Sequence, residues 1–242
     1  MTAPGTFDPP GPPPRGNATL APVLTRPPSL MRGRHGDRVL EFRPPSPTDA
    51  RALIEAIHAS LPELRPFMPF AHLDNTVDQQ FERLIRVQAD YWGDGDTIFH
   101  LWHDARIVGC VGLHKRTLNA RGRELGYWIR SDVAGQGFAT FAVRSLVVLC
   151  FEFLGYERLQ LLYNLANHGS RRVAEKAGFQ VEGTLRQFES RPTPDMVSNG
   201  AVEERNSVMN ALLESERAEL EWYAAHRDRL ELWDWEGQPV AG

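Results

Sequence analysis

The sequence lacks the features that mark membrane, metal-binding and disulfide-rich proteins. Its two cysteines, Cys110 and Cys150, give neither a metal-ligand spacing nor a disulfide framework. No run reaches the roughly 18 uncharged apolar residues that a membrane span needs. The most apolar segment, 138–154, contains Arg144 and Glu152, and the N-terminus has no apolar signal core. We therefore expect a cytoplasmic protein with no metal and no membrane partner, in which both cysteines are buried.

The sequence also has no basic excess. The formal net charge is -4, and lysine occurs at only two positions, Lys115 and Lys176. A dedicated nucleic-acid-binding protein normally carries a surplus of positive charge, so nucleic acid is not expected as a partner. The hydrophobic content of 42% over 242 residues is normal for a globular core.

Three regions differ in composition. Residues 1–35 are rich in proline and predict a flexible N-terminal arm, because proline fits neither a helix interior nor a central strand. Residues 36–213 form the expected folded domain. Residues 214–242 predict a charged helical extension whose three tryptophans cover the domain or a second subunit, so that a homodimer is possible.

Hydrophobic periodicity predicts an alternation of strands and helices within residues 36–213. The expected elements are a strand at 37–43, helices from 46 and at 76–92, strands at 97–102, 107–113 and 123–129, a helix at 137–154, a strand at 157–163, a helix at 170–177, and strands at 179–188 and 205–213. In the second helix we expect Phe81, Leu84, Ile85 and Val87 to face the core. The apolar loop 64–71 is expected to plug the core or to line a substrate pocket.

The segment 123–140 combines a strand, a glycine-containing loop and the start of a long helix. Gly135 and Gly137 allow backbone amides to approach one another without a Cβ in the way. A helix that begins near Gly137 directs its unpaired N–H groups and the positive end of its dipole into the loop. The sequence therefore predicts a site for a phosphate or pyrophosphate group.

Three motifs in this order are similar to those of the GNAT superfamily of acyl-CoA-dependent N-acyltransferases, and specifically to Rim-type ribosomal-protein N-terminal acetyltransferases. They are 124–129 (ELGYWI), 135–140 (GQGFAT) and 167–179 (NHGSRRVAEKAGF). The resemblance covers about residues 38–213. It implies an α/β (α+β) fold with a mixed, mostly antiparallel central sheet, flanked by helices, in which the fourth and fifth strands splay apart.

The resemblance also implies where acetyl-CoA binds as co-substrate. Backbone amides around 136–139 hold the pyrophosphate, and the splayed strands receive the pantetheine arm. Ala134 departs from the glutamine or arginine that is frequent in the family, but a cradle of backbone donors should lose little by this change. The implied cofactor-binding residues are Ile129, Ala134, Gly135, Gln136, Gly137, Phe138, Ala139, Thr140, Asn167 and Ser170.

N-acylation needs a neutral amine, a stabilised oxyanion and a proton for the departing thiolate. Ser170 matches the family serine that is the general acid of Rim-type enzymes, although it also occupies a position suited to a helix N-cap. Glu189 and Glu124 compete for the role of general base, with a slight preference for Glu189. His114 and Tyr127 are further candidates.

The sequence thus indicates an N-acetyltransferase that transfers acetyl directly to a primary amine. A protein or peptide N-terminus is the leading acceptor, and a small-molecule amine, such as an aminoglycoside or an amino-acid-like compound, is the alternative. The acceptor is expected to enter from the side of the first two helices and the loop 64–75. A non-catalytic acyl-CoA sensor is a third possibility, against which stand the intact glycine loop and the two glutamates.

Overall fold

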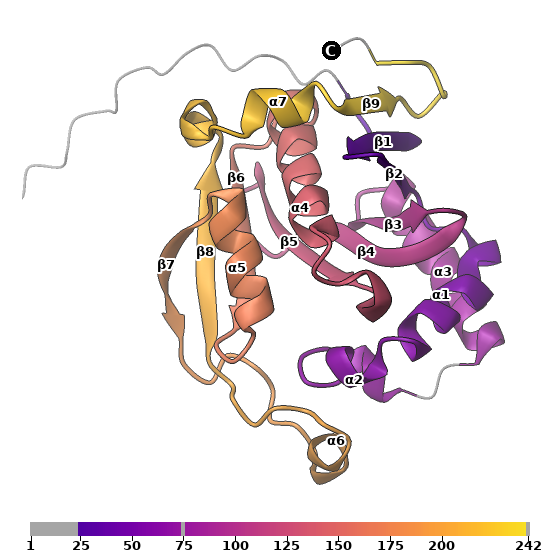
Figure 1. Ribbon diagram of the computed structural model, residues 1–242, viewed down its shortest axis with the longest axis vertical. Coiled ribbons are helices and arrows are strands. Elements are labelled where there is room, and N and C mark those ends of the chain that lie inside the picture. The colour runs from indigo at the N-terminus through magenta and orange to yellow at the C-terminus, as the bar shows by residue number, and fades with distance from the viewer. Residues whose placement is uncertain (1–23, 74–75, 241–242) are drawn as a thin grey trace, which may run out of the picture.

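The computed structural model describes residues 24–73 and 76–240, and this part of the chain forms one mixed sheet flanked by helices (Figure 1). The strands are β1 (Leu30–His35), β2 (Arg38–Arg43), β3 (Thr97–His103), β4 (Arg106–His114), β5 (Gly122–Ile129), β6 (Arg158–Asn164), β7 (Gln180–Leu185), β8 (Ser207–Leu213) and β9 (Leu230–Trp233). The helices are α1 (Ala50–His58), α2 (Leu61–Leu64), α3 (Val77–Trp92), α4 (Phe138–Val148), α5 (His168–Ala177), α6 (Pro194–Ser198) and α7 (Tyr223–Arg227). Within these residues, no helix is long and apolar enough to cross a membrane.

The nine strands follow the order β7-β8-β6-β5-β4-β3-β2-β1-β9. Neighbouring strands are antiparallel except β5 and β6, which run parallel and pair only over 122–124 and 158–160. Beyond Glu124 and Gln160 the two strands separate. This confirms the predicted mostly antiparallel sheet with a splay between the strands that the sequence placed fourth and fifth.

Helix α4 crosses in front of the splay, with α5 beside it, while α1 and α3 lie on the other side of the sheet (Figure 1). Apolar residues surround almost the whole of α4, from Phe138 to Val148, and most of them are buried. A helix that is apolar on all sides is typical of a core position. The predicted helix at 137–154 is therefore confirmed, with its last turn widened into a π-helical turn over Leu149–Phe153.

The N-terminal boundary of the folded domain lies earlier than predicted. Residues 1–23 of the expected arm lie outside the described residues, but residues 30–35 form strand β1, which pairs with β2 and β9. One inward position of β1 is Gly33, where a Cβ would lie 2.6 Å from Cζ of Phe141. The glycine lets α4 approach the backbone of β1 closely. Because β1 is short and has no side chain at Gly33, its sequence lacks the apolar alternation that marks a strand.

The C-terminal prediction also needs correction. The segment after β8 contains a 3-10 helix at Glu214–Glu219, the short helix α7 and strand β9, so it is not one charged helix. Figure 1 shows α7 lying across the end of α4 and β9 beside β1 at the edge of the sheet. In α7, Tyr223 and His226 are buried, and Leu232 is the buried residue of β9. This segment completes the domain core.

Helix α3 faces the core with a different stripe than predicted. Leu84 is buried as expected, but Phe81 and Ile85 are 44% and 49% exposed. Gln80 and Tyr91 take the buried positions instead. The two cysteines are free thiols, and Cys150 is buried as expected, whereas Cys110 is only partly buried.

The docking of α7 predicts a pH-dependent contribution to stability. The imidazole Nε2 of His226 lies 3.0 Å from Oγ of Ser145, and burial, reinforced by Arg144 and Arg229, lowers the pKa of His226 to about 3. Because an unfolded histidine titrates near 6.5, its stabilising contribution is complete above that pH and is lost as the pH falls toward 3. Between pH 7 and pH 5 the loss is about 2 kcal/mol.

Urea unfolding of the wild type and of His226→Gln at pH 7 and pH 5 measures this contribution. We expect the free energy of unfolding of the variant to change less over this interval, by about 2 kcal/mol. An identical change in both proteins would show that His226 does not couple folding to protonation.

Candidate active site

The splay between β5 and β6 opens into a cavity with a volume of about 620 Å³. It brings together the predicted site residues except two: Gln136, whose side chain is hydrogen-bonded to Arg38 and to the carbonyl of Asp132, and the further candidate His114. The predicted residues that line it are Glu124, Ile129, Ala134, Gly135, Gly137, Phe138, Ala139, Thr140, Asn167, Ser170 and Glu189.

The glycine loop has the geometry of an anion site. Gly135 and Gly137 have φ values of 77° and 85°, in the left-handed region that favours glycine, and Gly137 is the N-cap of α4. Within the described residues, none of the backbone N–H groups of 135–140 donates a hydrogen bond. Consecutive free N–H groups at the start of an 11-residue helix attract an anion through their hydrogen bonds and the helix dipole.

The hairpin of β1 and β2 holds this loop in place. Nε2 of His35 lies 2.9 Å from the carbonyl oxygen of Gln136, and Arg38 donates from Nη1 to Oε1 of Gln136 at 2.5 Å. The sequence offered no sign of either contact, because both partners lie about a hundred residues from the loop. They keep the loop carbonyl and the Gln136 side chain turned away from the free N–H groups.

At the start of α5, the residue that caps the helix differs from the residue whose hydroxyl lies in the cavity. Asn167 is the N-cap, and its Oδ1 accepts a hydrogen bond from the backbone N–H of Ser170 at 2.9 Å. The alternative role of Ser170 as a cap is therefore wrong. Oγ of Ser170 lies 2.9 Å from the hydroxyl oxygen of Tyr127, and burial raises the pKa of Tyr127 to about 12. Tyr127 thus stays protonated at neutral pH beside the serine.

Glu189 extends into the cavity with one oxygen available. Its backbone is fixed by hydrogen bonds with Arg205, and its Oε1 accepts from Oγ of the buried Ser207 at 2.7 Å. Within the described residues, Oε2 accepts no hydrogen bond and Glu189 forms no ion pair. The carboxylate is therefore oriented but not neutralised.

Glu124 lies where the splay begins and is fully engaged. Its Oε1 accepts from Nη1 of Arg116 at 3.1 Å and its Oε2 from Nε2 of Gln160 at 3.1 Å. Its side chain is only 14% exposed. This carboxylate joins the ends of the two strands just where their backbone pairing stops.

His114 is not an isolated histidine. Its Nδ1 lies 2.6 Å from Oδ2 of Asp96, and its Nε2 lies over Gly126, where a Cβ would be only 3.0 Å away. Gly126 lines the cavity, but His114 itself does not. The pair supports the wall of the site from behind.

The far end of the cavity is formed by segments distant in sequence. Helix α2 and the loop that follows contribute Glu63, Leu64, Phe67 and Met68, so part of the apolar loop lines a cavity. From the connection after β7, Phe188 lines the cavity and is 57% exposed. The backbone N–H of Val202 donates to the carbonyl of Pro66 at 3.2 Å, which joins the two segments, and Figure 1 shows α2 and α6 lying together at this end.

Comparisons with known proteins agree with this geometry. Residues 39–180 match the family model of the acetyltransferase (GNAT) domain. YdaF of Bacillus subtilis strain 168, named as a candidate ribosomal N-acetyltransferase, is 32% identical over 141 residues, which is 58% of this chain and 77% of YdaF.

Two solved structures are similar over most of their lengths. RimJ of Mycobacterium smegmatis, in complex with CoA-disulfide, superposes with a TM-score of 0.67 and 26% identity, covering 84% of this chain and 95% of that one. The ribosomal-protein-S5-alanine acetyltransferase of Vibrio fischeri gives a TM-score of 0.65 over 76% of this chain and 97% of that one, and its 18% identity supports the fold alone. The chain belongs to the acetyltransferase (GNAT) domain family and is a GNAT N-acetyltransferase related to Rim-type enzymes.

Proposed function

We propose that this enzyme transfers an acetyl group from acetyl-CoA directly to the α-amino group of a protein or peptide N-terminus. The observation that carries the proposal is the single cavity in which a free anion-binding loop, a hydroxyl pair and an unpaired carboxylate oxygen lie together. These are the groups that the transfer requires: one to hold an anionic co-substrate, one to donate a proton and one to accept a proton.

The cavity suits acetyl-CoA in both shape and charge. The N–H groups of 135–140 are suited to the pyrophosphate, and Arg172 and Lys176 of α5 add positive charge to the same wall. The open edge of β5 beyond Glu124 offers backbone groups to an extended pantetheine arm. RimJ, whose structure contains CoA-disulfide, provides a precedent among related proteins.

In the proposed reaction the amine nitrogen attacks the thioester carbonyl carbon. A C–N bond forms, the C–S bond breaks, and the electron pair of that bond leaves on sulfur. Glu189 takes the proton that the amine loses, through its free Oε2. Ser170 gives its hydroxyl proton to the thiolate and is replenished by the adjacent Tyr127 hydroxyl.

Glu189 is preferred over Glu124 as the base for a geometric reason. Both oxygens of Glu124 already accept hydrogen bonds, one of them from a guanidinium group, whereas Glu189 has a free oxygen and no cationic partner. A carboxylate in an ion pair must lose that interaction before it can take a proton. We therefore assign Glu124 to positioning Arg116 and the apex of the splay.

The charge of the cavity favours a peptide over a polycationic small molecule. Three carboxylates, those of Glu63, Glu124 and Glu189, are matched by three cations, those of Arg116, Arg172 and Lys176. An acceptor with several positive charges would call for a net negative site. The exposed ring of Phe188 and the apolar residues after α2 suit the first side chains of a peptide.

Thiol release from acetyl-CoA tests the function. We expect turnover with peptides that have a free N-terminal amine, and none when the same peptides are N-terminally blocked but contain an internal lysine. Aminoglycosides and free amino acids serve as the comparison set. Tight CoA binding without turnover of any amine would contradict the enzymatic function, and turnover only of small amines would contradict the acceptor class.

Replacing the two glutamates separately tests the assignment of the base. Glu189→Gln should lower kcat/KM at neutral pH by about 100-fold and abolish the acidic limb of its pH profile, because the proton acceptor is lost. Glu124→Gln has a matched change in charge and should retain that limb. If the acidic limb disappears in Glu124→Gln and persists in Glu189→Gln, the assignment is wrong.

The hydroxyl pair gives a further prediction. Ser170→Ala should lower kcat by about 100-fold with little change in the KM for acetyl-CoA. Because Asn167 caps α5, Ser170→Ala should leave the melting temperature unchanged, whereas Asn167→Ala should destabilise the fold by about 1 kcal/mol. A loss of stability in Ser170→Ala as large as in Asn167→Ala would indicate a structural role for the serine.

A further inference from the structure

A second, smaller cavity of about 250 Å³ adjoins the glycine loop and is lined by basic side chains. We call this cavity the basic recess. Its polar lining comes from five elements or connections, β1, α4, α5, α7 and the turn before β9, which contribute His35, Arg144, Lys176, His226 and Arg229 respectively. No carboxylate is among the described residues that line it.

The cations of the basic recess have no anionic partner. Within residues 24–73 and 76–240, Arg144, Lys176 and Arg229 form no ion pair. Arg144 donates to the carbonyl of Lys176, but its Nε is buried and has no hydrogen-bond partner. A buried guanidinium N–H without an acceptor is costly unless a ligand satisfies it.

The environment of His226 supports the same conclusion. Burial, together with the positive charges of Arg144 and Arg229, holds the pKa of His226 far below its usual range, so the imidazole is neutral at physiological pH. The cations therefore create a positive potential that no carboxylate among the described lining residues offsets. An anion would be attracted to this recess.

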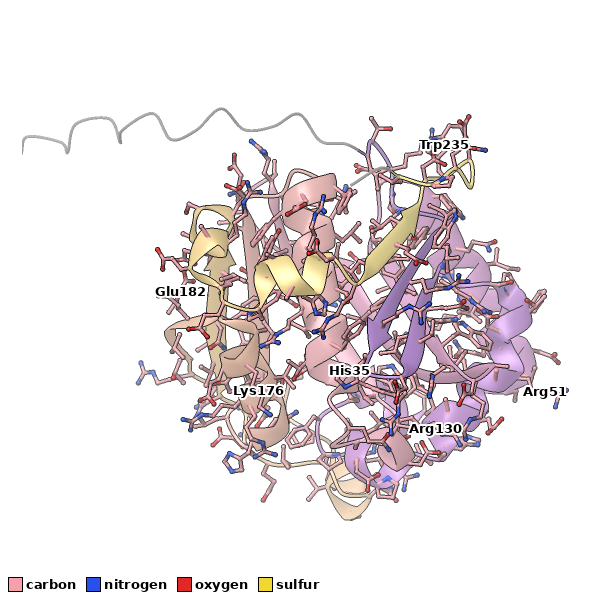
Figure 2. All side chains as sticks on the ribbon, turned by 45° about the horizontal axis from the view of Figure 1, so that its top comes forward. His35, Arg51, Arg130, Lys176, Glu182 and Trp235 are labelled. Atoms are coloured by element: carbon pink, nitrogen blue, oxygen red, sulfur yellow. The ribbon has the colours of Figure 1, made fainter. Side chains whose placement is uncertain are left out.

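The basic recess continues the co-substrate site. Gly137, Thr140 and Lys176 line both cavities, and Figure 2 shows His35 and Lys176 on either side of the first turn of α4. An anion in the recess is therefore adjacent to one held by the N–H groups of the loop. Acetyl-CoA carries both: a pyrophosphate and, on the neighbouring ribose, a separate 3′-phosphate.

We propose that the basic recess binds the 3′-phosphate of CoA and makes the enzyme selective for CoA over 3′-dephospho-CoA. The inference rests on the proposed function. It goes beyond it because His35, His226 and Arg229 lie outside residues 39–180, which match the family model. The N-terminal strand and the C-terminal segment thus build a phosphate subsite that the matched region does not contain by itself.

Calorimetric titration with CoA and with 3′-dephospho-CoA tests the proposal. The wild type should bind CoA at least about tenfold more tightly, as expected for charge-assisted contacts to a phosphate. Arg229→Gln should weaken CoA binding about tenfold and leave 3′-dephospho-CoA binding unchanged. Because the Arg229 side chain is exposed, the fold should tolerate this change, and Arg229→Lys should recover part of the lost affinity.

Arg34→Gln is the matched control. Arg34 lies beside Arg229, to whose carbonyl its backbone N–H donates at 3.3 Å, and it is exposed and unpaired but does not line the recess. This variant should retain the wild-type selectivity. Equal weakening in the two glutamine variants would overturn the subsite.

The result for the wild type distinguishes a failure of the phosphate subsite from a failure of the proposed function. If it binds both nucleotides equally and still transfers acetyl groups, the subsite is overturned and the proposed function stands. If it binds neither nucleotide, both are overturned.

Discussion

The three-residue parallel pairing between β5 and β6 is the constraint on which the site depends. Strand β5 is paired with β4 over six residues on its other edge, and β6 is paired with β8 over seven, so each strand is rigid within its own half of the sheet. Only their first residues meet, and the gap beyond Glu124 and Gln160 cannot close without breaking one of these longer ladders. The backbone groups along the gap are left for a ligand, because buried N–H and C=O groups need partners.

Helix α4 makes this opening stable. It contacts both the strands before the splay and α5, which covers the strands after it, and its apolar surface fills the space beneath the gap. The N-terminus of α4 therefore lies at the gap, and the free N–H groups of the loop lie at the cavity. The β1–β2 hairpin holds Gln136 of this loop through His35 and Arg38.

The sequence predicted what depends on neighbouring residues. Most strand and helix positions between 37 and 213 followed from periodicity, except the short helices α2 and α6, and the glycine loop and the 167–179 motif located the cavity wall. It did not predict what depends on distant partners. Strand β1 has glycine at an inward position and pairs with both β2 and β9, and β9 is four residues long and pairs with β1, about 200 residues away in sequence. The Tyr127–Ser170 contact likewise joins residues 43 positions apart.

Positively and negatively charged side chains are distributed unevenly along the cavity. Cations from α5 lie near the glycine loop, and the basic recess extends this positive region, whereas Glu63 and Glu189 line the cavity on α2 and on the connection after β7. Under the proposed function, the positive end would attract the anionic co-substrate and the negative end an amine that arrives protonated. Segments outside residues 39–180 contribute to both ends, since Glu189 follows that range and Arg229 lies near the C-terminus. The matched region thus supplies the loop, the splay and most of the charged side chains, and the flanking segments add Glu189 at one end and Arg229 at the other.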